Sequence, residues 1–177
     1  MKSAMVEFFG TYAHGIVFLH VFSAVVWVGG MMAIRLAVHP SLQAIEDPKI
    51  KLGRILTITG SFFNIVLPFI VLMLVTAILM AVGLGFRNAA VDQNGQVISE
   101  TAMHIYNMVH VKEAIWFIMT INFTWMYLKQ RKAQKLFNEN NFSQAKKSLE
   151  LIPKFLLPIN IVLGVIALWL GITLRGF

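Results

Sequence analysis

The chain alternates between long apolar stretches and shorter polar ones. Four stretches, at roughly 11–34, 55–86, 103–128 and 151–174, consist mainly of apolar side chains. An α-helix of about 20 such residues is long enough to cross the hydrocarbon core of a bilayer. The pattern therefore predicts an all-α protein, an integral membrane four-helix bundle that forms a single domain over residues 1–177.

Polar connections separate the four apolar stretches and contain turn signals at Pro48, at Asn94 and Gly95, and at the "NENN" that ends at Asn141. Residues 35–54 hold four Lys and Arg side chains, and residues 129–154 hold seven. Cytoplasmic loops of membrane proteins accumulate these residues. We therefore expect both basic connections on the cytoplasmic side and both termini outside.

Composition supports this class, because 58% of the residues are hydrophobic, 13% are charged, and the mean hydropathy is +0.73. Cysteine is absent, which excludes disulfides, thiolate metal sites and thiol catalysis. The net charge of +7 is explained by the two basic connections, so we expect the lipid bilayer and no nucleic acid as a partner. The first stretch is long, and Lys2 is the only Lys or Arg residue before it, which favours a retained helix over a cleaved signal peptide.

Histidine spacing indicates an internal repeat. His14 and His20 lie 90 positions before His104 and His110, and "NIVL" occurs twice, 96 positions apart. Two repeated helical hairpins, related by an axis along the membrane normal, would explain both matches. The first and third helices would then face each other across that axis, with each pair of histidines at one depth.

Only one of the two histidine pairs can face the axis, because residues six apart on a helix point about 120° away from each other. His20 shares its face with small, weakly polar side chains, and His110 shares its face with Asn107 and Glu113. Polar side chains within a span are costly unless they point inward, where they usually serve a function. We therefore expect His20 and His110 to face each other inside the bundle.

Two facing imidazoles in a helical bundle are typical of a b-type haem site, where they are the axial ligands of the iron. His20 and His110 are the candidate ligands. Further residues expected around the haem are Trp27, Asn107, Lys112 and Glu113. Electron transfer or redox sensing would be the function, with a quinone or a redox protein as partner. The competing interpretation is that each histidine simply bonds a neighbouring hydroxyl or carbonyl.

A copper site is the alternative cofactor hypothesis. His14, Met103, His104 and Met108 lie together at the predicted outer rim, and thioether with imidazole suits Cu(I). Methionine is also an ordinary apolar filler of helix interfaces. The sequence leaves haem and copper open. Small-residue faces would also permit a homodimer.

Three segments resemble copper-resistance-D-like proteins. They are "LHVFSAVVWVGGMMAIRLAVHPSL", "VHVKEAIWFIM" and "LPINIVLGVIALWLGITLRG". The matching positions are His20, Trp27, Gly29, Gly30, Pro40, His110 and Lys112. This resemblance implies a small multi-pass protein of the bacterial inner membrane.

HemJ-type protoporphyrinogen oxidases look related to the same family and bind b-type haem. Their first helix carries a histidine and a tryptophan, and after these an arginine followed by a second histidine. Arg35 and His39 resemble this last pair. This implies a third hypothesis, an oxidase in which Lys112, Glu113 or Arg35 holds carboxylates or moves protons. The chain departs from that pattern in "WVGG", in the Arg to His spacing and in lacking a charged motif before the last helix. Whether the protein is an enzyme therefore stays open.

Overall fold

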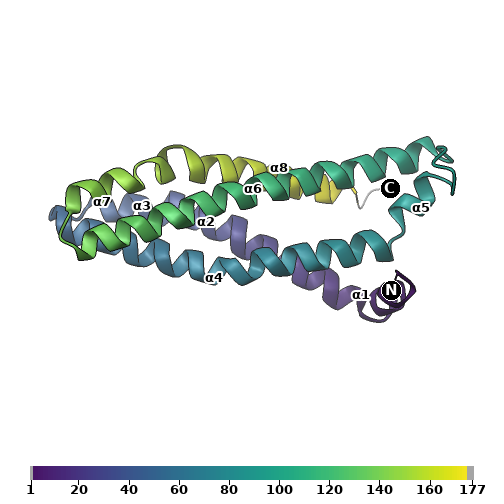
Figure 1. The fold of residues 1–177 in the computed structure, drawn as a ribbon, viewed down its shortest axis with the longest axis horizontal. Helices are drawn as coiled ribbons and strands as arrows, with labels where there is room; N and C mark the ends of the chain where they lie inside the picture. Colours follow the sequence, from purple (N-terminus) through teal and green to yellow (C-terminus); the bar gives the residue numbers. More distant parts are fainter. Residues whose placement is uncertain (1, 175–177) are drawn as a thin grey trace.

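The fold is an antiparallel bundle of four long helical rods, seen in a computed structural model that describes residues 2–174 (Figure 1). The first rod comprises α1 (Lys2–Ala24), η1 (Val25–Gly29), α2 (Gly30–Ala33), η2 (Ile34–Val38) and α3 (His39–Gln43). The second is α4 (Pro48–Gly83), followed by the short α5 (Phe86–Ala90). The third is α6 (Glu100–Asn138), and the fourth comprises α7 (Phe142–Leu149), η3 (Ile152–Leu156) and α8 (Leu157–Thr173).

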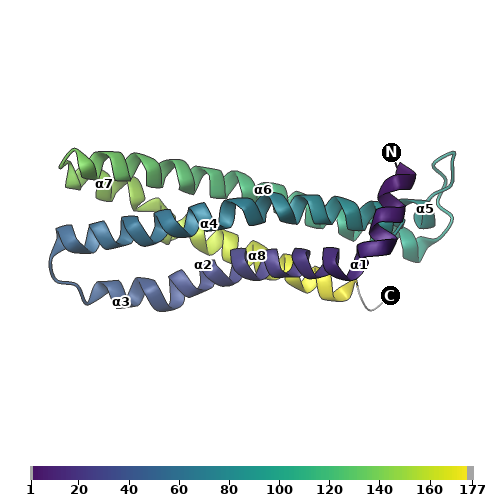
Figure 2. The same ribbon diagram turned by 90° about the horizontal axis from the view of Figure 1, so that it is seen from below.

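Neighbouring helices close the bundle into a ring. α1 packs on α4, α4 on α6, α6 on α8, and α8 on η1 and α2. The first and third rods are therefore diagonal, so they face each other across the bundle axis as the repeat predicts. The start of α1 and the end of α8 lie at the same end of the bundle as α5, and α3 and α7 lie at the opposite end (Figure 2).

Three segments are long and apolar enough to cross a membrane, namely Ser3–Gln43, Pro48–Ala90 and Phe142–Thr173. α6 has 39 residues and is long enough as well. Its polar side chains, among them Lys112, Glu113 and Asn122, lower its hydropathy, so that the predicted third span is not among the three. That α6 crosses a membrane stays a prediction.

The predicted turns are found where the connections change direction. Asp47 begins α4, and its carboxylate accepts hydrogen bonds from the backbone N–H of Lys49 at 2.7 Å and of Ile50 at 3.0 Å. Gly95 adopts a positive φ of 83° in the second connection, and Asn140 a positive φ of 60° between α6 and α7. The first rod also bends at Tyr12, where the first predicted span begins, so the preceding turns lie across the end of the bundle (Figure 2).

Two π-helical segments precede prolines. Pro40 follows η2 and Pro158 follows η3. A proline inside a helix lacks the N–H that would bond the carbonyl four residues earlier, and its ring clashes with that carbonyl. A widened π turn moves the carbonyl away, which accounts for the position of both segments.

Aromatic and aliphatic side chains fill the centre of the bundle. Phe123 of α6 lies edge-on to Trp27 of η1, with ring centroids 6.1 Å apart, and to Phe63 of α4 at 5.3 Å. Gly164 of α8 gives room to this core, because an added Cβ would lie 2.6 Å from a methyl carbon of Val28. The first and fourth rods can therefore approach closely only while Gly164 has no side chain.

Candidate functional site

His20 is held from α4 by a buried hydroxyl. Its Nδ1 lies 3.0 Å from Oγ1 of Thr76, whose hydroxyl already donates to the backbone carbonyl of Leu72 at 2.8 Å. The threonine oxygen is therefore left as an acceptor, and the Nδ1–H of His20 donates to it. In the tautomer that donates from Nδ1, the Nε2 of His20 carries a lone pair.

Lys112 reaches the same level of the bundle from α6. It is partly buried and lies close enough to His20 for the two side chains to interact electrostatically. Gly171 of α8 makes room for it, since an added Cβ would lie 3.2 Å from the lysine Nζ. His20, Thr76, Lys112 and Gly171 thus come from four different rods, and we refer to them as the His20 layer.

His110 does not belong to this layer, which corrects the expectation that it faces His20. Its side chain is 51% exposed, its Nδ1 lies 2.9 Å from Oε2 of Glu113, and its ring stands edge-on to Tyr106 at 4.4 Å. Residues two apart on an α-helix point about 160° away from each other. Because Lys112 faces the bundle, His110 faces away from it. Asn107 and Glu113 are exposed on this outer surface as well.

The register of the buried positions explains this error. Inward-facing residues of the first rod recur on α6 at an offset of 92 positions. The pairs are Ser23 and Ile115, Trp27 and Met119, and Met31 and Phe123. The counterpart of His20 is therefore Lys112. The prediction paired histidine with histidine at an offset of 90 positions. The two offsets differ by two residues, and two residues along a helix lead to its opposite face.

The two "NIVL" segments also occupy different environments. Asn64 lies on the outside of α4, where its Oδ1 accepts from Arg131 at 2.9 Å. Asn160 is fully buried in α8, where its Oδ1 accepts from Asn122 at 2.8 Å and its Nδ2 donates to the carbonyl of Met119 at 3.1 Å. Sequence reasoning missed this buried contact between α6 and α8, although asparagines within apolar stretches are its visible signal.

Trp27 lies on the face of His20, about two turns nearer the middle of the bundle. Its side chain is 1% exposed and packs against Phe123. The indole Nε1–H has no hydrogen-bond acceptor among the described residues. A buried donor without a partner costs about 1–3 kcal/mol. Trp27 is thus a core residue that also offers an unused donor to the interior.

The residues of the copper hypothesis are spread over two diagonal rods. His14 lies on an exposed face of α1 and His104 on an exposed face of α6, and these helices belong to diagonal rods. Met108 is partly buried, and its sulfur is 3.9 Å from the hydroxyl of Thr173. Met103 is also only partly buried on α6. The structure does not bring these four side chains together around one point.

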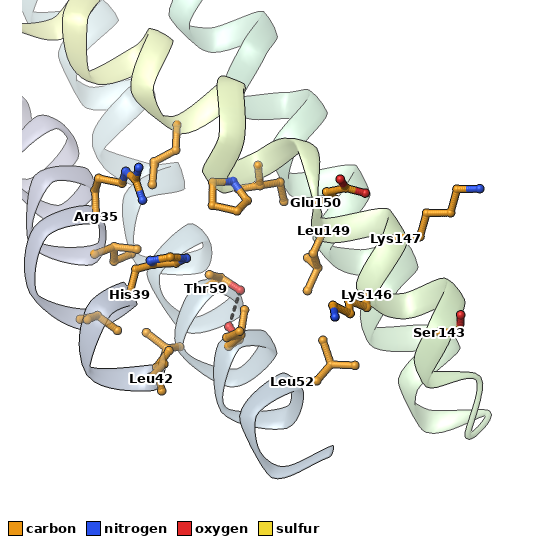
Figure 3. A pocket seen from close by; sticks show the side chains of 17 residues that line it. Arg35, His39, Leu42, Leu52, Thr59, Ser143, Lys146, Lys147, Leu149 and Glu150 are labelled. Carbon is orange, nitrogen blue, oxygen red and sulfur yellow. Dashed lines mark hydrogen bonds between the residues drawn. The ribbon is translucent and has the colours of Figure 1, made fainter. Parts of the chain in front are cut away.

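A cavity of about 360 Å³ lies at the other end of the bundle, between η2 and α3, the start of α4, and α7 with η3 (Figure 3). Arg35 and His39 point into it from the first rod, and Lys146 points into it from α7, whereas Lys147 points away (Figure 3). Most of the remaining lining is aliphatic. No pattern in the sequence indicated this cavity, because its two walls are more than 100 residues apart.

The molecule thus contains two places with unused chemistry. The His20 layer combines an imidazole nitrogen that can coordinate a metal with an amine that can hold a carboxylate. The cavity at the opposite end combines cations with an apolar floor. Comparisons of the chain with protein-family models, with curated proteins and with solved structures found no match in any of the three.

Proposed function

We propose that this protein is a multi-pass protein of the bacterial inner membrane that binds one b-type haem through His20 and transfers electrons. The observation that carries the proposal is the hydrogen bond from His20 to Thr76. Histidines that ligate metals usually donate their other ring N–H to a neighbouring acceptor, which sets the tautomer and the direction of the ring. The contact between His20 and Thr76 has this arrangement when the ring proton is on Nδ1.

Exposed apolar side chains support insertion of all four rods. Phe18, Leu128 and Trp169 are each more than 60% exposed, and Val71 of α4 is 58% exposed, which is costly in water and favourable in lipid. On α6, Phe117, Ile121 and Trp125 face outward, whereas Lys112 and Asn122 make inward contacts. A low hydropathy with an apolar outer face suits a helix that crosses the membrane inside a bundle.

The basic connections give the proposed orientation. The first lies at the end of the bundle near α3, and the third near α7, and both carry many Lys and Arg residues. The positive-inside rule assigns that end to the cytoplasm. Both termini, and the His20 layer nearer to them, would then lie toward the outer face of the membrane.

One further feature of the His20 layer suits a haem, namely the positive charge of Lys112. Lys112 lies in the interior beside His20, and the carboxylate next to it in the chain, Glu113, bonds His110 instead. A haem propionate would supply the missing negative charge. When bound, haem supplies one-electron redox chemistry at its iron. His110 faces outward, so the proposal assigns His20 as the one histidine ligand from the bundle interior.

The test is the visible spectrum of the protein purified in a mild detergent after expression with added haem precursor. The wild type should show a Soret band with sharp reduced bands, and His20→Ala should remove them. His110→Ala is the matched control and should retain the spectrum. Loss of the spectrum in His110→Ala with retention in His20→Ala would overturn the ligand assignment.

The same preparation separates the alternatives. Bound copper without a Soret band would refute haem and favour copper handling. Turnover of a porphyrinogen by the haem-loaded protein would extend the proposal to the oxidase reaction. Without turnover, electron transfer remains the proposed function.

A further inference from the structure

We infer that the cavity at the basic end binds the headgroup of an anionic phospholipid, with the glycerol and the first part of an acyl chain on its apolar floor. This inference rests on the proposed membrane orientation and is independent of haem. The cavity of about 360 Å³ lies within the range of small-molecule sites, which is about 300–1,000 Å³. A cavity of this volume can hold one part of such a lipid but not the whole molecule.

The basic side chains that line the cavity favour a ligand with negative charge. Arg35, His39 and Lys146 point into the cavity from two opposite walls (Figure 3), and Glu150 is the carboxylate on its lining. Within the described part of the chain, none of these three basic side chains forms a hydrogen bond or an ion pair. A cavity lined by unpaired basic groups beside low-dielectric walls attracts anions. Arg35 can bind a phosphate through two parallel N–H donors.

Shape and polarity select a lipid over a free anion. The floor is made of aliphatic side chains, which include Leu42, Leu52, Ile55, Leu149 and Leu157. A free phosphate would contact the basic groups alone and would leave this surface without a partner. A phospholipid contacts both parts at once, because its phosphate and its acyl chain are covalently joined.

The backbone and the place of the cavity support a binding role. η2 contributes Ile34, Arg35 and Val38 to one wall, and η3 contributes Ile152 and Pro153 to the other. π-helical turns are rare and occur frequently at functional sites. Basic pockets between helices on the cytoplasmic side are a known type of site for anionic lipid headgroups.

Binding can be measured by native mass spectrometry of the full chain in a neutral detergent. The probes are dioctanoyl phosphatidylglycerol, the matched dioctanoyl phosphatidylcholine, and inorganic phosphate. We expect phosphatidylglycerol to bind at least about tenfold more tightly than phosphatidylcholine, and Arg35→Gln to remove most of this preference. Lys146→Gln should weaken binding of the anionic lipid, whereas Lys147→Gln, the matched control that points away, should not.

Three outcomes would overturn the inference. Equal affinity for the two lipids would remove the anionic headgroup as the determinant. Inorganic phosphate binding as tightly as phosphatidylglycerol would indicate a soluble anion. Equal losses in Lys146→Gln and Lys147→Gln would indicate diffuse surface charge. If Arg35→Gln does not fold, as judged by its helical circular dichroism, His39→Gln and Lys146→Gln carry the test. The visible spectrum should not change in Lys146→Gln, which separates this inference from haem binding.

Discussion

Thr76→Val tests the central contact of the His20 layer, because valine has nearly the shape of threonine but no hydroxyl. The substitution removes the acceptor 3.0 Å from the Nδ1 of His20 and leaves the buried helix face apolar. Without that acceptor, the imidazole can rotate and change its tautomer. Thr76→Ser is the control, because serine keeps the hydroxyl and loses a methyl group.

Two magnitudes follow from this geometry. Loss of a hydrogen-bond partner that orients a metal ligand typically costs 10–100-fold in affinity, about 1.4–2.7 kcal/mol, so haem affinity should fall by that factor. An N–H that loses its partner in the interior costs about 1–3 kcal/mol. Because His20 is only partly buried, we expect the haem-free protein to lose about 1 kcal/mol, at the lower end of that range.

Haem affinity is measured by competition with a haem-accepting apoprotein, and stability by reversible unfolding in mixed detergent. Thr76→Ser should stay within about threefold of the wild type in haem affinity, well inside the tenfold minimum expected for the valine variant. The reasoning is refuted if Thr76→Val and Thr76→Ser behave alike in both measurements. Unchanged stability of Thr76→Val with unchanged affinity would mean that His20 does not depend on this bond.

Three further predictions concern the stability of the bundle. Gly164→Ala should destabilise the bundle by about 1–3 kcal/mol because its methyl group would overlap Val28, and Val28→Ala in the same chain should restore stability. Asn122→Ala and Asn160→Ala should show a coupling of about 0.6–1.7 kcal/mol in a double-mutant cycle, and additive effects would contradict the bond at 2.8 Å. Glu113→Gln should change stability by less than about 1 kcal/mol, as measured by the same unfolding assay, because its contact is exposed.

The inward face of the first rod was predicted correctly because the side chains on its two faces differ in size. His20 was expected on an inward face with small, weakly polar side chains, and Ser23 and Trp27 on that face are fully buried. Small side chains pack between helices, whereas Phe18 and Val21 are large, apolar and exposed. Size and polarity therefore point the same way on this helix.

The orientation of α6 was predicted wrongly because polarity alone was used. His110 and Glu113 are three residues apart and satisfy each other on the outer surface, so neither needs a partner in the interior. Lys112 faces inward instead. Counting polar residues does not show which of them face the interior and which face outward. The buried series of Ile115, Met119 and Phe123 was present in the sequence and gives the correct face.

The cavity at the basic end could not be predicted from either of its walls alone. Arg35 and His39 were noted through a family resemblance, and Lys146 was counted only as a topological charge. Their convergence depends on how the first and fourth rods pack around the start of α4. Such a tertiary approach has no local signature in the chain.

The π-helical segments make single-residue deletions informative. A π turn holds one residue more than the α-helical turn it replaces. Removing one residue from η1 would return that stretch to an α-helix while the helix faces on either side keep their directions. The same deletion a few residues earlier in α1 would rotate His20 away from Thr76. Length variation between natural versions of this chain should therefore concentrate in these wide turns.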